Sequence, residues 1–260
     1  MTAPPLLAAK HLCKRFPAPG GGTRVAVDDV SLELFSGETL ALVGESGCGK
    51  TTLARMLARL LEPDSGEISF EGKNLLAARG RELRALRREM QMVFQDPYAS
   101  LNPRQRVASI VGEPLVIHEP GLAREPRRSR VRETLAAVGL DATALPRYPH
   151  EFSGGQRQRI GIARALILRP KLIIADEPVS ALDVSVGAQI LELLQTLQRD
   201  FHLTYLLISH SLPVVAQLAT RVAVMNNGRI VELGAAPQVL RAPAHPYTRE
   251  LLAAVPVLPA

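Results

Sequence analysis

Eight consecutive residues of the sequence form a pattern suited to binding phosphate groups. They match the order G-x-x-x-x-G-K-[ST] and are Gly44, Glu45, Ser46, Gly47, Cys48, Gly49, Lys50 and Thr51. Glycines let the backbone approach a phosphate without a Cβ clash, and Lys50 supplies positive charge to the β- and γ-phosphates. The Thr51 hydroxyl can ligate Mg²⁺, and Thr52 is a further candidate for nucleotide contact. The alternative interpretation is a glycine turn followed by a solvated lysine.

Two carboxylates follow a short apolar run at residues 172–175. Carboxylates at the carboxyl end of a buried strand can orient Mg²⁺ and a water molecule. We therefore expect Asp176 to hold the metal, directly or through water. Glu177 would be the general base that activates water for attack on a γ-phosphate. Taken alone, the same two residues also fit a helix cap or a solvated turn.

A third segment, residues 152–159, begins a predicted helix with a serine cap at Ser153 and two glycines, Gly154 and Gly155, before Gln156. Backbone N–H groups at such a helix start can meet an anion. The pattern by itself does not distinguish an anion site from an ordinary helix start.

Alternating and continuous apolar runs predict the elements that position these residues. Residues 24–34 alternate and predict a strand in an antiparallel edge region, and Thr39–Val43 predicts a buried strand that leads through the glycine-rich loop into a helix at Lys50–Leu61. Further strands are expected at 68–70, 91–94, 172–175, 205–209 and 221–225, and further helices at 155–168 and 184–201. Several of the strands are apolar on both faces, as in parallel sheets, so the fold class is α/β. The Pro- and Arg-rich stretch from about Pro97 to Pro149 is expected to be a mostly helical insertion.

Composition restricts the possible partners. The 260 residues carry a net charge of +6, which suits nucleotide phosphate, nucleic acid or an anionic membrane surface. Aromatic residues make up 4% and tryptophan is absent, so the sequence has few residues that could stack on single-stranded nucleic acid.

Two distant cysteines, Cys13 and Cys48, argue against a disulfide framework. No apolar run approaches the ~18 residues of a spanning helix, and the N-terminal residues do not resemble a signal peptide, so we expect a cytoplasmic location.

Ser153-Gly154-Gly155-Gln156 resembles the signature sequence of ATP-binding cassette (ABC) ATPases, and it lies between the glycine-rich loop and the Asp176-Glu177 pair. The other landmarks of that family follow in order at Gln95, at Ser180–Asp183 and at His210, so the resemblance covers essentially the whole chain. It implies one nucleotide-binding domain over residues 1–260, with a RecA-like parallel sheet core, an N-terminal antiparallel β subdomain and a helical subdomain. The helical subdomain would span about 97–150 and continue into the signature helix to about 168, and a short His-Pro-Tyr tail would span about 236–260.

The resemblance also implies roles for single residues in a dimer that encloses ATP between the glycine-rich loop of one subunit and the signature of the other. Gln95 would sense Mg²⁺ and the attacking water, His210 would contact the γ-phosphate and hold Glu177, and Asp183 would link the two sites. Phe16 resembles the aromatic residue that stacks on adenine, although ordinary packing is an alternative. The sequence departs from the family at Ser211, where an aspartate usually follows the histidine.

Three longer segments, residues 96–104, 178–185 and 244–252, resemble ATP-binding subunits of bacterial dipeptide and oligopeptide importers. That group also includes transporters for nickel, glutathione and antimicrobial peptides. The resemblance implies a peripheral protein on the cytoplasmic face of the inner membrane that uses ATP and Mg²⁺ and couples ATP hydrolysis to peptide uptake. Its expected partners are two permease subunits, a second ABC ATPase subunit that forms a heterodimer rather than a homodimer, and indirectly an external substrate-binding protein. No nucleic acid partner is expected, and a soluble ABC ATPase acting on DNA or ribosomes is disfavoured because the sequence has no second P-loop.

Overall fold

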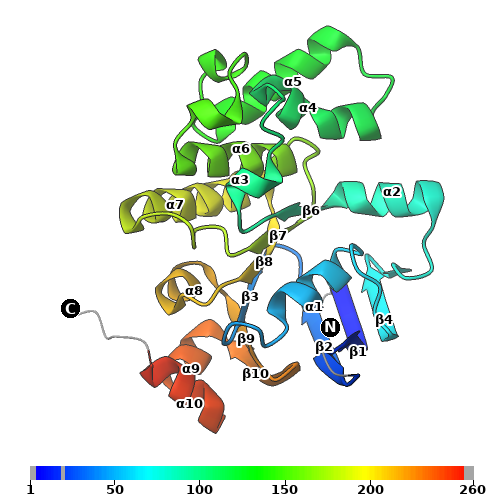
Figure 1. The fold of residues 1–260 in the computed structure, drawn as a ribbon, viewed down its shortest axis with the longest axis vertical. Helices are drawn as coiled ribbons and strands as arrows, with labels where there is room; N and C mark the ends of the chain where they lie inside the picture. The colour runs from blue at the N-terminus through cyan, green and yellow to red at the C-terminus, as the bar shows by residue number, and fades with distance from the viewer. Residues whose placement is uncertain (1–3, 19–20, 255–260) are drawn as a thin grey trace. The chain divides into compact units, whose positions relative to one another are not determined.

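The computed structural model describes residues 4–18 and 21–254 and divides into two compact units. One unit combines Met1–Arg79 with Thr204–Ala260, and the other is Gly80–Leu203 (Figure 1). The described residues before Gly80 and those after Leu203 therefore belong to the same unit. Among the described residues, no helix combines the length and the hydrophobicity needed to cross a bilayer.

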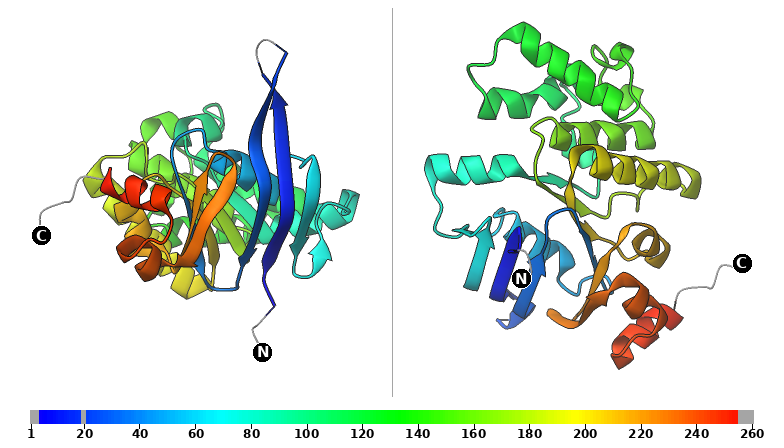
Figure 2. Two further views of the ribbon diagram at one scale, coloured as in Figure 1. Left: turned by 90° about the horizontal axis from the view of Figure 1, so that it is seen from below. Right: turned by 180° about the vertical axis from the view of Figure 1, so that it is seen from behind.

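The first unit contains an antiparallel sheet in the order β2-β1-β4-β5 (Figure 2). Its strands are β1 (Leu7–Pro17), β2 (Thr23–Leu34), β4 (Ser65–Phe70) and β5 (Lys73–Asn74). The strand predicted from the alternation of residues 24–34 is confirmed as β2. The sequence analysis did not identify β1, because register shifts between Ala9 and Arg15 break the period of two that marks a strand.

The same unit contains a second group of strands with β3 (Thr39–Val43) between β8 (Thr204–Ile208) and β9 (Arg221–Asn226). Both pairings of β3 are parallel, whereas β10 (Arg229–Ala235) pairs with β9 in antiparallel orientation. Every residue of β3 and β8 is buried. Burial on both faces explains why these strands are continuous apolar runs.

Helix α1 (Lys50–Leu57) begins directly after the glycine-rich loop and is shorter than predicted. The predicted boundary of this helix at Leu61 is wrong. Arg59 adopts a left-handed conformation with φ of 55°, and the Leu60 and Leu61 N–H groups turn back to the Arg55 carbonyl. This C-terminal motif closes the helix although the apolar spacing continues.

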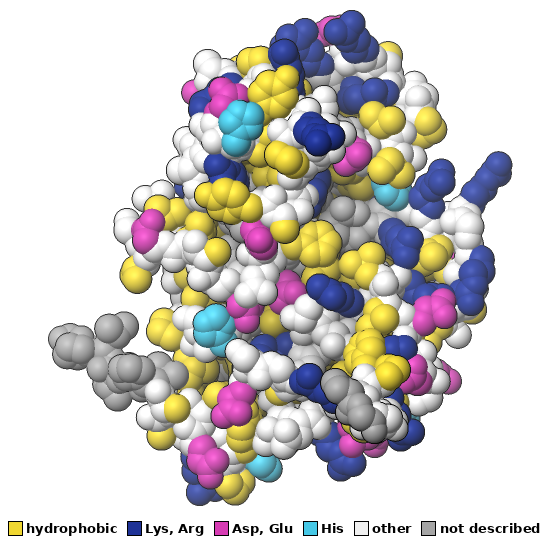
Figure 3. All heavy atoms as spheres, viewed as in Figure 1, with side chains coloured by type: hydrophobic (Ala, Val, Ile, Leu, Met, Phe, Trp, Pro, Cys, Tyr) yellow, Lys and Arg dark blue, Asp and Glu magenta, His cyan; other side chains and the backbone are white. Residues whose placement is uncertain are grey.

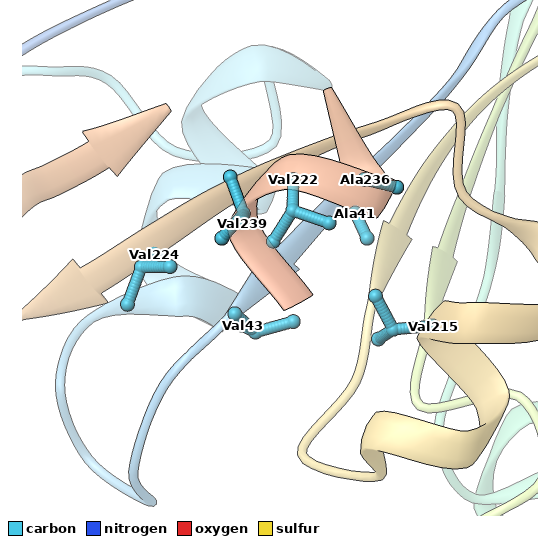
Figure 4. Packing of buried hydrophobic residues seen from close by; sticks show 7 residues of the cluster. All are labelled: Ala41, Val43, Val215, Val222, Val224, Ala236 and Val239. Atoms are coloured by element: carbon cyan, nitrogen blue, oxygen red, sulfur yellow. The ribbon is translucent and has the colours of Figure 1, made fainter. Parts of the chain in front are cut away.

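Three further helices belong to this unit: α8 (Leu212–Leu218) lies between β8 and β9 in the chain, and α9 (Ala236–Arg241) and α10 (Pro246–Ala253) follow β10. Figure 4 shows the small apolar side chains that pack between α8, α9 and strands β3 and β9. This core cluster consists of Ala41, Val43, Val215, Val222, Val224, Ala236 and Val239. Tyr247 and Leu251 of α10 are partly buried against it, so the last helix is anchored to the strand that leads into the glycine-rich loop.

The second unit is mostly helical and holds one parallel strand pair, β6 (Met90–Val93) with β7 (Leu172–Asp176). Its helical segments are α2 (Gly80–Glu89), α3 (Pro97–Ser100), α4 (Val107–His118), α5 (Arg124–Ala137), η1 (Ala142–Ala144), η2 (Pro149–Glu151), α6 (Gly154–Leu166) and α7 (Val184–Phe201). Between β6 and β7 the chain is helical, as the sequence analysis predicted for the stretch before the signature helix.

Arginines cover the outer faces of α2 and α5 (Figure 3). Only Leu86 of α2 is buried, so this helix presents a solvated basic face. Two of the arginines are ordered by one carboxylate, because Glu119 accepts from Arg88 at 2.7 Å and from Arg130 at 2.9 Å. The shared carboxylate ties α2 and α5 to the end of α4.

Candidate functional site

The glycine-rich loop, residues 44–49 between β3 and α1, is pressed against neighbouring backbone. Gly44 and Gly49 have φ of 151° and 112°, and a Cβ at these positions would lie 2.1 Å from the Met225 carbonyl oxygen and 2.0 Å from the Ala26 carbonyl oxygen. No side chain fits there, and L-residues rarely adopt such φ values. The sequence analysis attributed the glycines to the approach of phosphate, but at these two positions the protein's own backbone already requires glycine.

Lys50 is the first residue of α1, and its side chain is buried with 6% exposure. Its Nζ donates to the Gly44 carbonyl at 2.7 Å and to the Glu45 carbonyl at 2.8 Å, and Cys48 Sγ is 3.7 Å away. The loop therefore encloses an ammonium group beside the N-terminus of a helix, where N–H groups and the helix dipole favour an anion. This cradle fits the phosphates of a nucleotide.

The remaining loop residues differ in exposure. Glu45, Ser46 and Gly47 are exposed, and Cys48 is buried. Thr51 and Thr52 lie in the first turn of α1 with partly exposed side chains. A hydroxyl at this turn is a donor type that Mg²⁺ accepts as a ligand.

Backbone and side-chain groups from three other segments hold the loop from outside. The Cys48 carbonyl accepts from Gly228 N–H at 3.0 Å, and the Gly47 carbonyl accepts from Arg24 Nη2 at 3.0 Å. The Glu45 N–H donates to the Tyr247 hydroxyl at 3.3 Å. The sequence analysis did not find these anchors, because each lies far from the loop in the chain.

Asp176 is the last residue of β7 in the second unit and Glu177 follows it, and the environments of the two carboxylates differ. Asp176 is buried with 3% exposure, whereas Glu177 is partly exposed. Glu177 has a φ of 47°, a left-handed conformation that is uncommon for a residue with a side chain. The backbone bends at Glu177, directly after the end of β7. The two adjacent carboxylates therefore lie in different environments, Asp176 in the interior and Glu177 near the surface.

Gln95 lies next to Glu177. Its Nε2 donates to Glu177 Oε2 at 2.8 Å, although 82 residues separate them. The cause is the parallel pairing of β6 with β7, in which Val93 lies opposite Ala175, so that both strands end at the same edge. With its amide N–H bound to the carboxylate, Gln95 keeps its carbonyl oxygen as a possible metal ligand.

The signature residues form the start of α6. Ser153 Oγ accepts from Gln156 N–H at 3.3 Å, and Gln156 Oε1 accepts from Ser153 N–H at 3.1 Å. This reciprocal pair is a capping box, so the predicted serine cap is confirmed and Gln156 is a structural part of it. The exposed N-terminus of α6 retains N–H groups that suit an anion.

The second signature glycine has a packing role that the sequence analysis did not identify. Gly155 is buried, and a Cβ there would lie 2.3 Å from Val186 Cγ1 on α7, whereas a Cβ on Gly154 would lie 3.3 Å from Leu182 Cδ2. Gly155 therefore allows the start of α6 to lie against α7. Asp183 caps α7, since its Oδ1 accepts from Val186 N–H at 2.9 Å.

Phe16 and His210 belong to the first unit. Phe16 lies on β1 with 36% exposure, and Lys14 Nζ is 5.7 Å from the centre of its ring. His210 is exposed directly after β8. The next residue, Ser211, is the N-cap of α8, and its backbone N–H donates to Ser209 Oγ at 3.0 Å, a contact that uses no side-chain atom of Ser211.

The predicted site residues thus divide between the two units. Phe16, the glycine-rich loop with Lys50, and His210 lie in one. Gln95, Asp176, Glu177, Asp183 and the signature residues lie in the other, where Gln95 and Glu177 are in direct contact.

Comparison with known proteins identifies close relatives of this chain. The family model described as "ABC transporter" matches residues 27–180. The chain is 52% identical to the oligopeptide transport ATP-binding protein OppF of Bacillus subtilis, covering 97% of this chain and 83% of that protein. It is 54% identical to OppF of Escherichia coli (90% and 70% covered) and 51% identical to the glutathione import ATP-binding protein GsiA of Pectobacterium atrosepticum, of which it covers 42%.

Solved structures agree with this similarity. The ATP-binding cassette MJ0796, in a dimeric post-hydrolysis state bound to ADP and Pi, matches with a TM-score of 0.80 and 29% identity over 88% of this chain and 98% of that one. The cassette cbiO1 of Clostridium perfringens matches with a TM-score of 0.79 and 28% identity over 92% of this chain and 91% of that one. The predicted α/β cassette fold is confirmed.

Proposed function

The chain belongs to the ABC transporter family, and from that premise we propose that it is the ATP-hydrolysing subunit of an importer that carries di- or oligopeptides across the bacterial inner membrane. The observation that carries the hydrolytic role is the 2.8 Å hydrogen bond between Gln95 and Glu177 at the ends of two paired strands. The identity of 52–54% with two OppF proteins supports the peptide cargo.

In the proposed reaction, a water oxygen attacks the γ-phosphorus of ATP and the bond to the β–γ bridging oxygen breaks, releasing ADP. Glu177 accepts the proton of the attacking water, and the Gln95 amide holds the carboxylate by donating to Oε2. The Lys50 ammonium binds phosphate oxygens and offsets their negative charge. His210 would contact the γ-phosphate.

Thr51, Gln95 and Asp176 are the residues that would hold Mg²⁺, which supplies charge neutralisation on the phosphate oxygens. A hydroxyl, an amide oxygen and a carboxylate are the hard oxygen donors that this ion prefers. Asp176 is buried at the carboxyl end of β7, the end of a parallel strand at which α/β proteins bind ligands, which supports this assignment.

The proposed complex has a second ABC ATPase subunit, which makes a heterodimer with this chain. In it, Ser153, Gly154, Gly155 and Gln156 of one subunit face the nucleotide that is held by residues 44–52 of the other. Asp183 links the two nucleotide sites of the dimer, and Phe16 stacks on adenine. One structural relative is a dimeric ATP-binding cassette bound to ADP and Pi, which supports a dimer.

A groove in the helical unit is the proposed docking surface for a permease subunit. It has a volume of about 890 Å³ and lies between α4, α5 and η1. Its lining includes Arg106, Arg124, Arg127 and Arg128 with Glu113, so its charge complements an acidic cytoplasmic helix of the permease. Two such permease subunits would place the chain on the cytoplasmic face of the membrane, and an external binding protein would deliver the peptide.

Glutathione uptake is the second candidate function. The GsiA proteins are 51–54% identical to this chain, the same range as the OppF proteins, so this similarity supports both cargoes. Nickel and antimicrobial peptides are the other cargoes of the importer group that the sequence resembles. The cargo is bound outside the ATPase subunit, and the associated binding protein therefore distinguishes the candidates.

The test is to isolate the Glu177→Gln chain from native membranes in ATP and Mg²⁺ and to identify the proteins that accompany it by mass spectrometry. Recovery of two permease subunits, a second ABC ATPase and a binding protein supports the proposal, and the ligand of that binding protein identifies the cargo. The control is the double variant Lys50→Ala with Glu177→Gln, which should lose any partner whose association depends on ATP. Recovery of only soluble nucleic-acid machinery would reject the transport role.

A further inference from the structure

The last helix of the described chain makes a direct polar contact with the glycine-rich loop. Tyr247, the second residue of α10, accepts a hydrogen bond from Glu45 N–H at 3.3 Å across 202 residues of sequence. We propose that Tyr247 is a positioning residue for nucleotide binding, whose hydroxyl fixes the peptide unit between Gly44 and Glu45. This inference rests on the proposed role of residues 44–51 as the phosphate-binding loop.

The peptide unit between Gly44 and Glu45 is held on both sides. Its carbonyl, which belongs to Gly44, accepts from Lys50 Nζ at 2.7 Å, and its N–H, which belongs to Glu45, donates to Tyr247. The described residues contain no cis peptide bond, so the carbonyl and the N–H of this planar unit point in opposite directions. Lys50 and Tyr247 therefore hold opposite edges of one rigid plane.

The two contacts have different consequences when a nucleotide binds. Lys50 supplies the charge for the phosphates, so its ammonium must share or leave the Gly44 carbonyl when they arrive. The Tyr247 contact lies on the other edge and does not compete with phosphate. Tyr247 thus keeps the peptide plane in place while Lys50 moves to the nucleotide. This restraint is needed at Gly44 because the backbone of glycine rotates more freely than that of any other residue.

The start of α10 is itself held firmly, so that the hydroxyl has a defined position. His245 Nδ1 accepts from Tyr247 N–H at 3.2 Å and caps the helix. The Glu232 carboxylate on β10 accepts from Ala244 N–H at 2.8 Å and from His245 N–H at 3.1 Å. Burial alone would raise the pKa of Glu232, but the hydrogen bonds that it accepts outweigh burial and lower it. The carboxylate is therefore charged at neutral pH.

The tyrosine ring rests on the same core that supports the loop. Tyr247 and Leu251 pack on the cluster of Figure 4, which includes Val43, the residue directly before Gly44. Burial raises the pKa of Tyr247, so the phenol stays neutral at physiological pH and its oxygen can accept the Glu45 N–H. The ring and the hydroxyl therefore have separable roles, packing for the ring and loop positioning for the hydroxyl.

The experiment compares two variants of the full chain. Tyr247→Phe removes the hydroxyl and keeps the ring, whereas Leu251→Ala removes packing from the same helix and keeps the hydroxyl. KM and kcat for ATP hydrolysis, the equilibrium affinity for a fluorescent ATP analogue and the melting temperature are measured for both. Loss of one hydrogen bond predicts a rise in KM and in the analogue's Kd of about threefold to tenfold for Tyr247→Phe, with kcat within about twofold of the wild type.

Leu251→Ala should lower the melting temperature and leave KM unchanged. A Tyr247→Phe variant with wild-type KM and analogue affinity would overturn the inference. An equal rise in KM for both variants would also overturn it, because α10 would then act through packing alone. Lys50→Ala is measured alongside: if it binds the analogue normally, the phosphate-loop assignment itself fails, whereas a failure confined to Tyr247→Phe rejects only this inference.

Discussion

At the residue scale, the environments of two adjacent carboxylates, Asp176 and Glu177, indicate which chemical role suits each of them. Glu177 is partly exposed and is bound by the Gln95 amide, whereas the adjacent Asp176 is buried at the end of β7. An accessible carboxylate that is oriented by a neutral amide suits proton transfer from water. A buried carboxylate suits a fixed charge partner such as a metal ion.

We expect Glu177→Gln to retain ATP binding and to slow hydrolysis by at least about 100-fold, since a general base contributes roughly 10²–10⁴ in rate. Phosphate release under single-turnover conditions measures the rate, and a fluorescent ATP analogue measures binding. Glu192→Gln, at an exposed position of α7, makes the same chemical change away from the site and should behave as the wild type. Hydrolysis near the wild-type rate in Glu177→Gln would show that another group takes the proton.

Lys50→Ala should weaken ATP binding by more than about tenfold, because the charge-assisted hydrogen bonds that it would make with phosphate contribute roughly 1.5–3 kcal/mol. Calorimetric titration with ATP and Mg²⁺ gives the affinity. Lys73→Ala on the exposed strand β5 is the matched control for loss of one positive charge. Normal affinity in Lys50→Ala contradicts the assignment of residues 44–51.

At the element scale, two glycines of α6 differ in whether the surrounding structure leaves room for a side chain. Gly155 and Gly161 both lie in α6 and are both buried. A Cβ on Gly155 would meet Val186 at 2.3 Å, whereas a Cβ on Gly161 would have no neighbour within 4 Å outside its own stretch of helix. The contact between α6 and α7 therefore depends on Gly155 and leaves free space at Gly161.

Gly161→Ala should stabilise the protein by up to about 1 kcal/mol, because alanine favours helix over glycine by that amount. Gly155→Ala should destabilise it by about 1–3 kcal/mol, the usual range for overpacking. Chemical denaturation followed by circular dichroism measures both. Adding Val186→Ala to Gly155→Ala should recover part of the loss, and an unchanged loss would mean that the clash is not with Val186.

At the scale of the whole molecule, the site residues are shared between two compact units, and the surface of the helical unit is available for a partner. The groove between α4, α5 and η1 is lined by four arginines and one glutamate. Such a surface contributes to recognition mainly through charge complementarity, which governs the choice of partner and the association rate.

The double variant Arg124→Glu with Arg128→Glu should reduce recovery of permease subunits at least about tenfold while the affinity for ATP stays unchanged, because like charges across an interface cost several kcal/mol. Quantitative mass spectrometry of the purified complex measures the recovery. Arg81→Glu with Arg84→Glu on the exposed face of α2 carries the same charge change and serves as the control. Equal permease recovery from both double variants would place the docking surface elsewhere.

The sequence by itself determined the features whose causes are local. The glycine-rich loop with Lys50, the serine cap at Ser153 and the buried strand β7 depend on backbone freedom, capping groups and apolar runs that neighbouring residues specify. The end of α1 is an exception, because Arg59 leaves the helix although the apolar pattern continues to Leu61. A left-handed residue carries no clear signal in periodicity.

Only the tertiary structure decided which distant residues meet. The hydrogen bond from Gln95 to Glu177 depends on β6 pairing with β7, and the one from Glu45 to Tyr247 depends on α10 packing beside β3. Likewise, the intrinsic helix propensity of Gly155 equals that of Gly161, and the close approach of Val186 to Gly155 is found only in the structure. The physical reason is that such contacts form when elements far apart in the chain pack together and bury apolar surface. The local spacing of residues does not specify which of these elements pack against each other.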